Sequence, residues 1–102
     1  MIPASNKKRS DYRRSGHWGD LTLYQMFNAN VLAHPELMAV VDPCNRSDFT
    51  FGSPQRLTYR QLSDEVARIA ASLVEQGIGK DDIVFVQLPN IYELLATYFA
   101  CA

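Results

Sequence analysis

The side chains that most often carry out chemistry are spread along this chain of 102 residues. His17 and His34 flank a predicted helix, and no third metal-ligating residue type lies at metal spacing from them. Asp81 and Asp82 form a pair of carboxylates, which acid–base chemistry could use, but the sequence Gly-Lys-Asp-Asp is typical of a solvated turn. These residues therefore predict neither a metal site nor a general acid–base pair.

The candidate nucleophiles and phosphate-binding segments also lack the neighbours that their chemistry needs. Cys44 has only Arg46 near it in sequence to lower the pKa of its thiol. The Gly-Ile-Gly sequence at 77–79 follows a predicted helix and precedes a predicted strand, the reverse of a dinucleotide-binding loop. Asn90 is expected to cap the last predicted helix rather than to bind an anion. No histidine is close in sequence to the serines Ser53, Ser63 and Ser72. We predict no catalytic, cofactor-binding or metal-binding residue here.

Composition narrows the class of protein. The chain has 47% hydrophobic and 21% charged residues and a formal net charge of -1, without the basic excess of a dedicated nucleic-acid binder. At this length, a compact domain would bury about 65% of its extended surface. Cys44 and Cys101 are too isolated for a disulfide scaffold, so we expect a reducing, cytoplasmic location. The longest apolar run, residues 94–102, is shorter than the roughly 20 residues that span a bilayer.

The first 20 residues differ from the rest of the chain. Residues 1–14 hold five of the ten lysines and arginines, and no apolar periodicity runs through residues 1–20. We therefore predict a flexible basic arm, which is either a solvated tail or a contact for an acidic partner. Trp18, at the edge of the arm, is expected to pack as a plug against the domain surface.

Residues 21–102 alternate between helical and extended patterns. A helix is expected from Leu21 to His34, capped by Asp20 or Thr22 and ended by Pro35. A strand is predicted over 38–41, and residues 56–58 are expected to pair with it as a wide antiparallel hairpin. The intervening 44–55 is predicted to be a loop, with 49–51 extended.

The helix over residues 59–76 has the strongest local signals. Thr58 and Gln61 form a capping box, and Gly77 supplies a left-handed stop. An apolar stripe follows the helical period, and a row of opposite charges follows another face. The stripe consists of Leu62, Val66, Ile69, Ala70 and Leu73, and the charge row of Arg60, Asp64 and Arg68.

The last part of the chain predicts a buried strand followed by a helix. Residues 83–88 are almost continuously apolar, as in strands that are covered on both faces. Asn90 and Glu93 mark a helix start, and this helix reaches Ala102 without a stop signal. We expect an incomplete α/β fold, with helix, β-hairpin, helix, strand and helix in that order. The strand over 83–88 is expected to lack a neighbour and to promote self-association.

These elements resemble the beginning of the adenylate-forming (AMP-binding) superfamily, which contains acyl-CoA synthetases and aryl-CoA ligases. Residues 57–62, Leu-Thr-Tyr-Arg-Gln-Leu, resemble the first core motif of that family, leucine-threonine-tyrosine-x-glutamate-leucine, with Gln61 in place of the glutamate. The similarity continues through 67–73, 77–82 and 84–90, and it covers roughly residues 18–102, which is most of the chain.

The resemblance implies that residues 21–102 are the first portion of the large N-terminal domain of a ligase. Such an enzyme activates a carboxylate with ATP and magnesium and then transfers the acyl group to a thiol, commonly coenzyme A. The family's phosphate loop, metal-binding glutamate and C-terminal lysine lie downstream of the matched region, so no functional residue carries over to this chain. We therefore expect the chain to be inactive alone and to have the remainder of the parent enzyme as its partner.

Two other functions remain open from the sequence. The chain could be a small interaction module whose basic arm binds an acidic partner, with binding that weakens as salt rises. A small α/β nucleotide binder is a third reading, although the chain lacks a glycine-rich turn between a strand and a helix.

Overall fold

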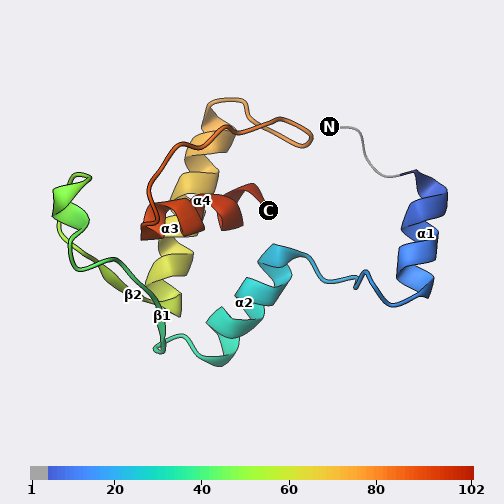
Figure 1. The fold of residues 1–102 in the computed structure, drawn as a ribbon, viewed down its shortest axis with the longest axis horizontal. Coiled ribbons are helices and arrows are strands. Elements are labelled where there is room, and N and C mark those ends of the chain that lie inside the picture. Colours follow the sequence, from blue (N-terminus) through green and yellow to red (C-terminus); the bar gives the residue numbers. More distant parts are fainter. Residues whose placement is uncertain (1–4) are drawn as a thin grey trace.

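The computed structural model describes residues 5–102, so the first four residues of the predicted arm lie outside the described part (Figure 1). Along the chain, the elements are two helices, a strand, a short 3-10 helix, a second strand and two further helices. They are α1 (Asn6–Arg14), α2 (Leu23–Ala33), β1 (Met38–Val41), η1 (Arg46–Asp48), β2 (Arg56–Thr58), α3 (Tyr59–Glu75) and α4 (Tyr92–Cys101).

The arm contains a helix that the sequence did not predict. The Ser5 hydroxyl accepts a hydrogen bond from the backbone N–H of Lys8, and two arginines in the last turn suit the negative end of the helix dipole. None of the α1 residues is buried, and the helix lies apart from the other elements (Figure 1). Trp18 packs on Tyr12 of α1, with 5.3 Å between ring centroids, rather than acting as the predicted plug on the domain body.

Local sequence signals correctly placed α2 and the hairpin. Thr22 and Gln25 form a capping box at the start of α2, and His34 ends that helix before Pro35. The strands β1 and β2 pair antiparallel, with Met38 opposite Thr58 and an irregularity between Met38 and Val40. The loop between them contains η1, and the predicted extended stretch over 49–51 is wrong because Phe49 continues the turn (ψ -7°).

The long helix α3 also follows its sequence signals, except for its ion pairs. The capping box of Thr58 and Gln61 is present, and Gly77 has a φ of +83° just after the helix. The charged residues Arg60, Asp64 and Arg68 are all exposed on α3, but the predicted pairing within their row is wrong. Arg60 pairs with Glu36 instead, and Arg68 pairs with Glu65. Glu36 is available because its segment runs beside the start of α3, where the Arg60 N–H donates to the Pro35 carbonyl.

The core lies where α2, α3 and α4 meet over one face of the hairpin. Its buried members are Phe27, Leu62, Val66 and Ala96. The Phe27 ring stacks on Phe99 of α4 at 4.2 Å between centroids. In the part of the chain that the structure describes, no helix is both long and apolar enough to cross a membrane.

The predicted strand over residues 83–88 does not form. The segment makes no ladder with the two-stranded sheet of β1 and β2, and its expected burial on both faces is wrong. Ile83 and Phe85 are 76% and 87% exposed, whereas Val84 and Val86 are half-buried. A strand exists only as part of a hydrogen-bonded ladder, and the described residues supply no neighbour for this one.

Candidate functional site

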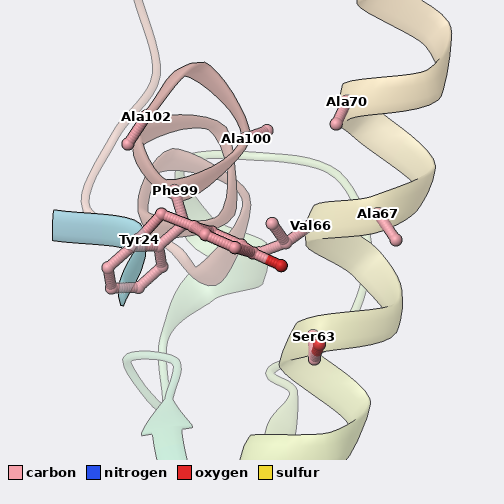
Figure 2. Close-up of a pocket in the computed structure, with 8 residues that line it drawn as sticks. All are labelled: Tyr24, Ser63, Val66, Ala67, Ala70, Phe99, Ala100 and Ala102. Atoms are coloured by element: carbon pink, nitrogen blue, oxygen red, sulfur yellow. The ribbon is translucent and has the colours of Figure 1, made fainter. Parts of the chain in front are cut away.

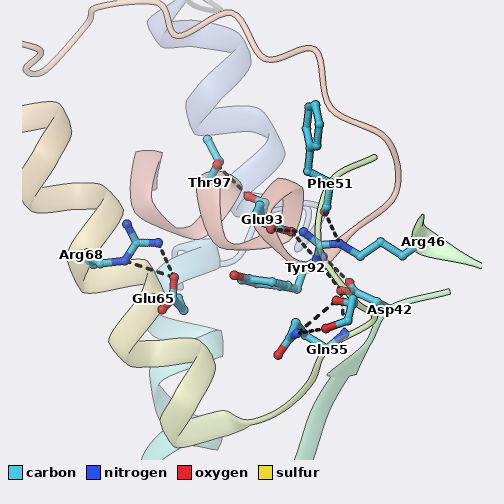
Figure 3. Close-up of polar contacts among 10 residues, drawn as sticks. Asp42, Arg46, Phe51, Gln55, Glu65, Arg68, Tyr92, Glu93 and Thr97 are labelled. Atoms are coloured by element: carbon cyan, nitrogen blue, oxygen red, sulfur yellow. Dashed lines mark hydrogen bonds and ion pairs between the residues drawn. The ribbon is translucent and has the colours of Figure 1, made fainter. Parts of the chain in front are cut away.

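The most concentrated polar chemistry in the described residues lies where the hairpin meets α4 (Figure 3). Asp42 follows β1 directly, Arg46 begins η1, and Glu93 lies in the first turn of α4. Asp42 and Arg46 are 5% and 6% exposed, which is unusual for charged residues. We call Asp42, Arg46 and Glu93 the arginine clamp.

Arg46 is held by oxygens from three segments. Its Nη1 donates to Asp42 Oδ2 at 2.6 Å and to Glu93 Oε2 at 3.0 Å, while its Nη2 donates to Glu93 Oε1 at 2.5 Å. Its Nε donates to the carbonyl of Phe51 at 3.3 Å. Because a guanidinium offers five N–H groups, these contacts nearly exhaust its capacity to donate. The two-pronged contact with Glu93 is the strong, geometrically specific kind of ion pair.

Asp42 connects the clamp to the backbone of two other segments. Its Oδ2 also accepts from the Gln55 backbone N–H at 3.0 Å, and its Oδ1 accepts from the Tyr92 N–H at 2.8 Å. The contact with Tyr92 corrects the sequence prediction for this helix start. Asn90 does not cap α4: the N-cap residue is Ile91, which makes no side-chain cap, so Asp42 supplies the missing acceptor from 50 residues earlier.

The contacts of the clamp favour the charged forms of Asp42 and Arg46. Burial alone would raise the pKa of Asp42, but hydrogen bonds from Arg46, Gln55 and Tyr92 outweigh it and lower the pKa below its ordinary value. Hydrogen bonds to Glu93 and Asp42 raise the pKa of Arg46. The guanidinium carbon also lies 5.4 Å from the centre of the Tyr92 ring. Burial, followed by the charges of Glu93 and Glu65, raises the pKa of the Tyr92 hydroxyl.

This arrangement suits a structural role better than a catalytic one. A group that acts as a general base near neutral pH needs a pKa close to that pH. The clamp instead lowers the pKa of Asp42, further from neutral pH. A hollow of about 310 Å³ adjoins Asp42, but both carboxylate oxygens already accept hydrogen bonds. The clamp therefore fastens the end of β1, the 44–55 loop and the start of α4 to one another.

A second hollow, of about 280 Å³, opens between α3 and α4 beside the start of α2 (Figure 2). Its side chains are mainly small and apolar, and the Ser63 and Tyr24 hydroxyls are its only polar side-chain groups. The lining consists of Tyr24, Ser63, Val66, Ala67, Ala70, Phe99, Ala100 and Ala102. With neither a base nor a charged group, this hollow has no machinery for a reaction.

The residues that the sequence singled out do not come together as a site. His17 Nδ1 lies 2.7 Å from the Ser15 hydroxyl oxygen, and His34 ends α2. Asp82 accepts from the backbone N–H of Gly79 at 2.8 Å, which closes the predicted turn. Cys44 and Cys101 are free and exposed. Over residues 5–102, no group of three or more histidines, cysteines, aspartates and glutamates is placed to hold a metal ion.

Sequence reasoning missed the clamp. The available signal was an aspartate at the end of a strand with an arginine four residues later, inside a polar loop. Such a pair is ordinary on a surface. Its partner Glu93 is 47 residues away, and only the packing of α4 on the hairpin brings it to Arg46.

A family model described as "AMP-binding enzyme" matches residues 27–102. The chain is 30% identical over 101 residues to a salicylyl-CoA synthase / salicylate adenylyltransferase of a Streptomyces species, covering 99% of the chain. It is 34% identical over 89 residues to enterobactin synthase component E of Escherichia coli K12, covering 87% of the chain.

A third similar protein is the medium-chain fatty-acid–CoA ligase of Escherichia coli K12, 30% identical over 97 residues and 95% of the chain. The matches span 16%, 14% and 15% of these three relatives, respectively, so the chain corresponds to a small part of their length. No solved structure matches the chain.

Proposed function

Because the chain belongs to the AMP-binding enzyme family, we propose that it is the N-terminal part of an ATP-dependent carboxylate–CoA ligase. In the first step, a carboxylate oxygen attacks the α-phosphate of ATP, which forms an acyl-adenylate and releases pyrophosphate. In the second step, the thiol of coenzyme A attacks the acyl carbon, which forms a thioester and releases AMP. The match of 27–102 to the family model is the observation that carries the proposal.

Within that enzyme, this chain acts as scaffold. ATP, magnesium and coenzyme A would be held by the remainder of the parent protein. Magnesium prefers open carboxylate oxygens, and those of Asp42 and Glu93 are engaged by Arg46 or by backbone N–H groups. These residues therefore do not fit the metal, and we assign no step of the reaction to them. The chain alone is accordingly inactive.

The relatives limit the proposed substrate only to the class of carboxylic acids. The names of two of them refer to salicylate and to medium-chain fatty acids, and both names include CoA. An aromatic or aliphatic acid and coenzyme A as the acceptor are thus part of the proposal. So is a reducing, cytoplasmic setting, which the two free, exposed cysteines support.

The test transplants the chain into a relative. The segment of the Streptomyces salicylyl-CoA synthase that aligns with this chain is deleted, or replaced by residues 1–102, and salicylate-dependent ATP–pyrophosphate exchange is measured. We expect no exchange from the deleted enzyme, none from the 102-residue chain alone, and restored exchange from the chimera. An Arg46→Met chimera should lose exchange, whereas Arg68→Met, which removes an exposed arginine, should retain it.

Two results would overturn the proposal. Exchange by the isolated chain with salicylate or a medium-chain fatty acid would contradict its inactivity. A chimera that is soluble and cooperatively folded but lacks exchange would contradict its place in a ligase.

One observation favours a second candidate, the acidic-partner module. The helix α1 presents Lys7, Lys8 and Arg9 on its exposed surface, and no α1 residue is buried. The module predicts that the chain binds a poly-glutamate column at low salt, elutes as salt rises, and fails to bind once residues 1–14 are deleted. Retention that survives the deletion would contradict it.

A further inference from the structure

The start of α4 has two alternative sets of capping groups, and the structure uses only one of them. Asn90, with Glu93 three residues later, is the sequence pattern of a capping box, in which each side chain accepts from a backbone N–H beside the other residue. In the structure Ile91 is the N-cap residue instead, and the backbone N–H of Tyr92 donates to Asp42 Oδ1 at 2.8 Å. The local capping box is therefore present in the sequence but is not formed.

Both arrangements need the side chain of Glu93. Its two carboxylate oxygens accept from the Arg46 guanidinium at 3.0 and 2.5 Å (Figure 3). In a capping box, the same carboxylate would accept from the backbone N–H of Asn90. The Tyr92 N–H, which Asp42 now holds, is also one of the donors that an Asn90 cap satisfies. The arginine clamp and the local capping box therefore compete for the same groups.

The backbone before α4 distinguishes the two helix starts. Ile91 is extended, with φ -126° and ψ 166°, and its N–H donates to the Pro89 carbonyl at 2.8 Å, which closes a three-residue turn around Asn90. The Leu94 N–H donates to the Ile91 carbonyl at 3.1 Å. In an α-helix that began one residue earlier, the acceptor for Leu94 would be the Asn90 carbonyl. The two starts thus differ by one residue.

We propose that the arginine clamp selects between these two starts, so that opening the clamp extends α4 by one residue, with Asn90 as N-cap and Glu93 closing the capping box. Arg46 is the only buried residue of the 44–55 loop in the described chain. The attachment of that loop is therefore coupled to the first turn of α4, and each favours one state of the other. This inference rests on contacts within the described chain and does not depend on the proposed ligase function.

A double-mutant cycle followed by urea unfolding tests the competition. Asn90→Ala should leave the unfolding equilibrium constant of the parent chain nearly unchanged, because Asn90 is exposed and does not cap α4. In an Arg46→Met background, the same substitution should raise that constant about five-fold, the usual effect of losing an N-cap. Asn90→Ser keeps a capping side chain and should have little effect in either background. Asn30→Ala, at an exposed asparagine of α2, is the control and should have one effect in both backgrounds.

The backbone conformation of Ile91 gives an independent readout. Its Cα and Cβ chemical shifts should be those of an extended residue in the parent chain and of a helical residue in Arg46→Met. Glu93→Gln opens the clamp more mildly, because glutamine lacks the charge that binds Arg46 but still closes a capping box. It should move the shifts in the same direction, and repeating the Asn90→Ala cycle in it keeps the test valid if Arg46→Met unfolds.

Two results would overturn this proposal. One is an Ile91 that stays extended in every folded variant with an open clamp. The other is an Asn90→Ala effect that is the same with and without the clamp. Either result would mean that burial of the Ile91 side chain, which is 6% exposed, selects the start of α4.

Discussion

At the scale of single residues, Arg46 is the side chain that makes the most hydrogen bonds in the described part of the chain, to Asp42, Glu93 and the Phe51 carbonyl. Its side chain is 8% exposed and that of Asp42 is 0% exposed, so both charges have lost most of their contact with water. Removing one partner of a buried ion pair leaves the other charge without compensation. Exposed pairs such as Arg68 with Glu65 behave differently, because solvent screens them and side-chain entropy opposes them.

We predict that Arg46→Met destabilises the chain by about 3 kcal/mol, because it leaves Asp42 buried without its cation and Glu93 unpaired. Urea unfolding followed by circular dichroism measures the loss. Arg68→Met, the same substitution at an exposed pair, should leave the unfolding midpoint close to that of the parent. Equal midpoints for the two variants would show that the clamp contributes no more than a surface pair.

The lowered pKa of Asp42 predicts a pH dependence of stability. The folded state binds the Asp42 proton more weakly than the unfolded state does, so this carboxyl stabilises the fold above its ordinary pKa of 3.8. The stabilisation is lost as pH falls through the lower folded-state pKa. Urea midpoints measured between pH 6 and pH 3 should therefore fall less for Asp42→Asn than for the parent. Asp64→Asn, at an exposed position, should keep the parent's profile.

At the scale of elements, α2 and α3 formed where the capping signals at the helix ends agreed with an apolar stripe along the helix. The capping boxes at Thr22 and Thr58 and the left-handed Gly77 are local features, so reading them needs no knowledge of the fold. The start of α4 could not be read in this way, because its cap is Asp42, supplied by another element. Residues 83–88 failed as a strand for a similar reason, since a strand depends on a neighbour.

Gly77 gives a test at this scale. Its φ of +83° lies in the left-handed region, and a Cβ there would meet nothing within 4 Å, so strain alone decides the cost of a side chain. We predict that Gly77→Ala costs about 1 kcal/mol of the free energy of unfolding. Gly79→Ala is the control, because Gly79 has equal space and no left-handed backbone. If the two variants unfold at the same urea concentration, the C-terminal stop of α3 is not strained.

At the scale of the whole molecule, the chain is less compact than a typical domain of the same length. Its radius of gyration is 16.3 Å, against about 13 Å for a compact domain of this size. Its accessible surface is 7896 Å², against about 5,800 Å² expected from its mass. The 65% burial predicted from length is therefore not reached. The separate position of α1 and the uncovered 83–88 segment account for part of the excess (Figure 1).

A small core makes the whole chain sensitive to a single truncation. We predict that Leu62→Ala, at 1% exposure, lowers the free energy of unfolding by about 3 kcal/mol through lost burial and the cavity left behind. Leu32→Ala, at 76% exposure, should change it little. Guanidinium unfolding at low temperature compares the two. Similar losses would mean that α2, α3 and α4 do not share one core.

The sequence by itself determined the positions of α2, β1, β2 and α3 and the resemblance that the family match confirmed. Those features depend on residues close in the chain or on the order of short motifs. Only the tertiary structure decided that Asp42, Arg46 and Glu93 form one buried clamp and that residues 83–88 stay unpaired. Both outcomes depend on which segments meet in space, and neither the spacing nor the composition of one segment specifies its distant neighbour.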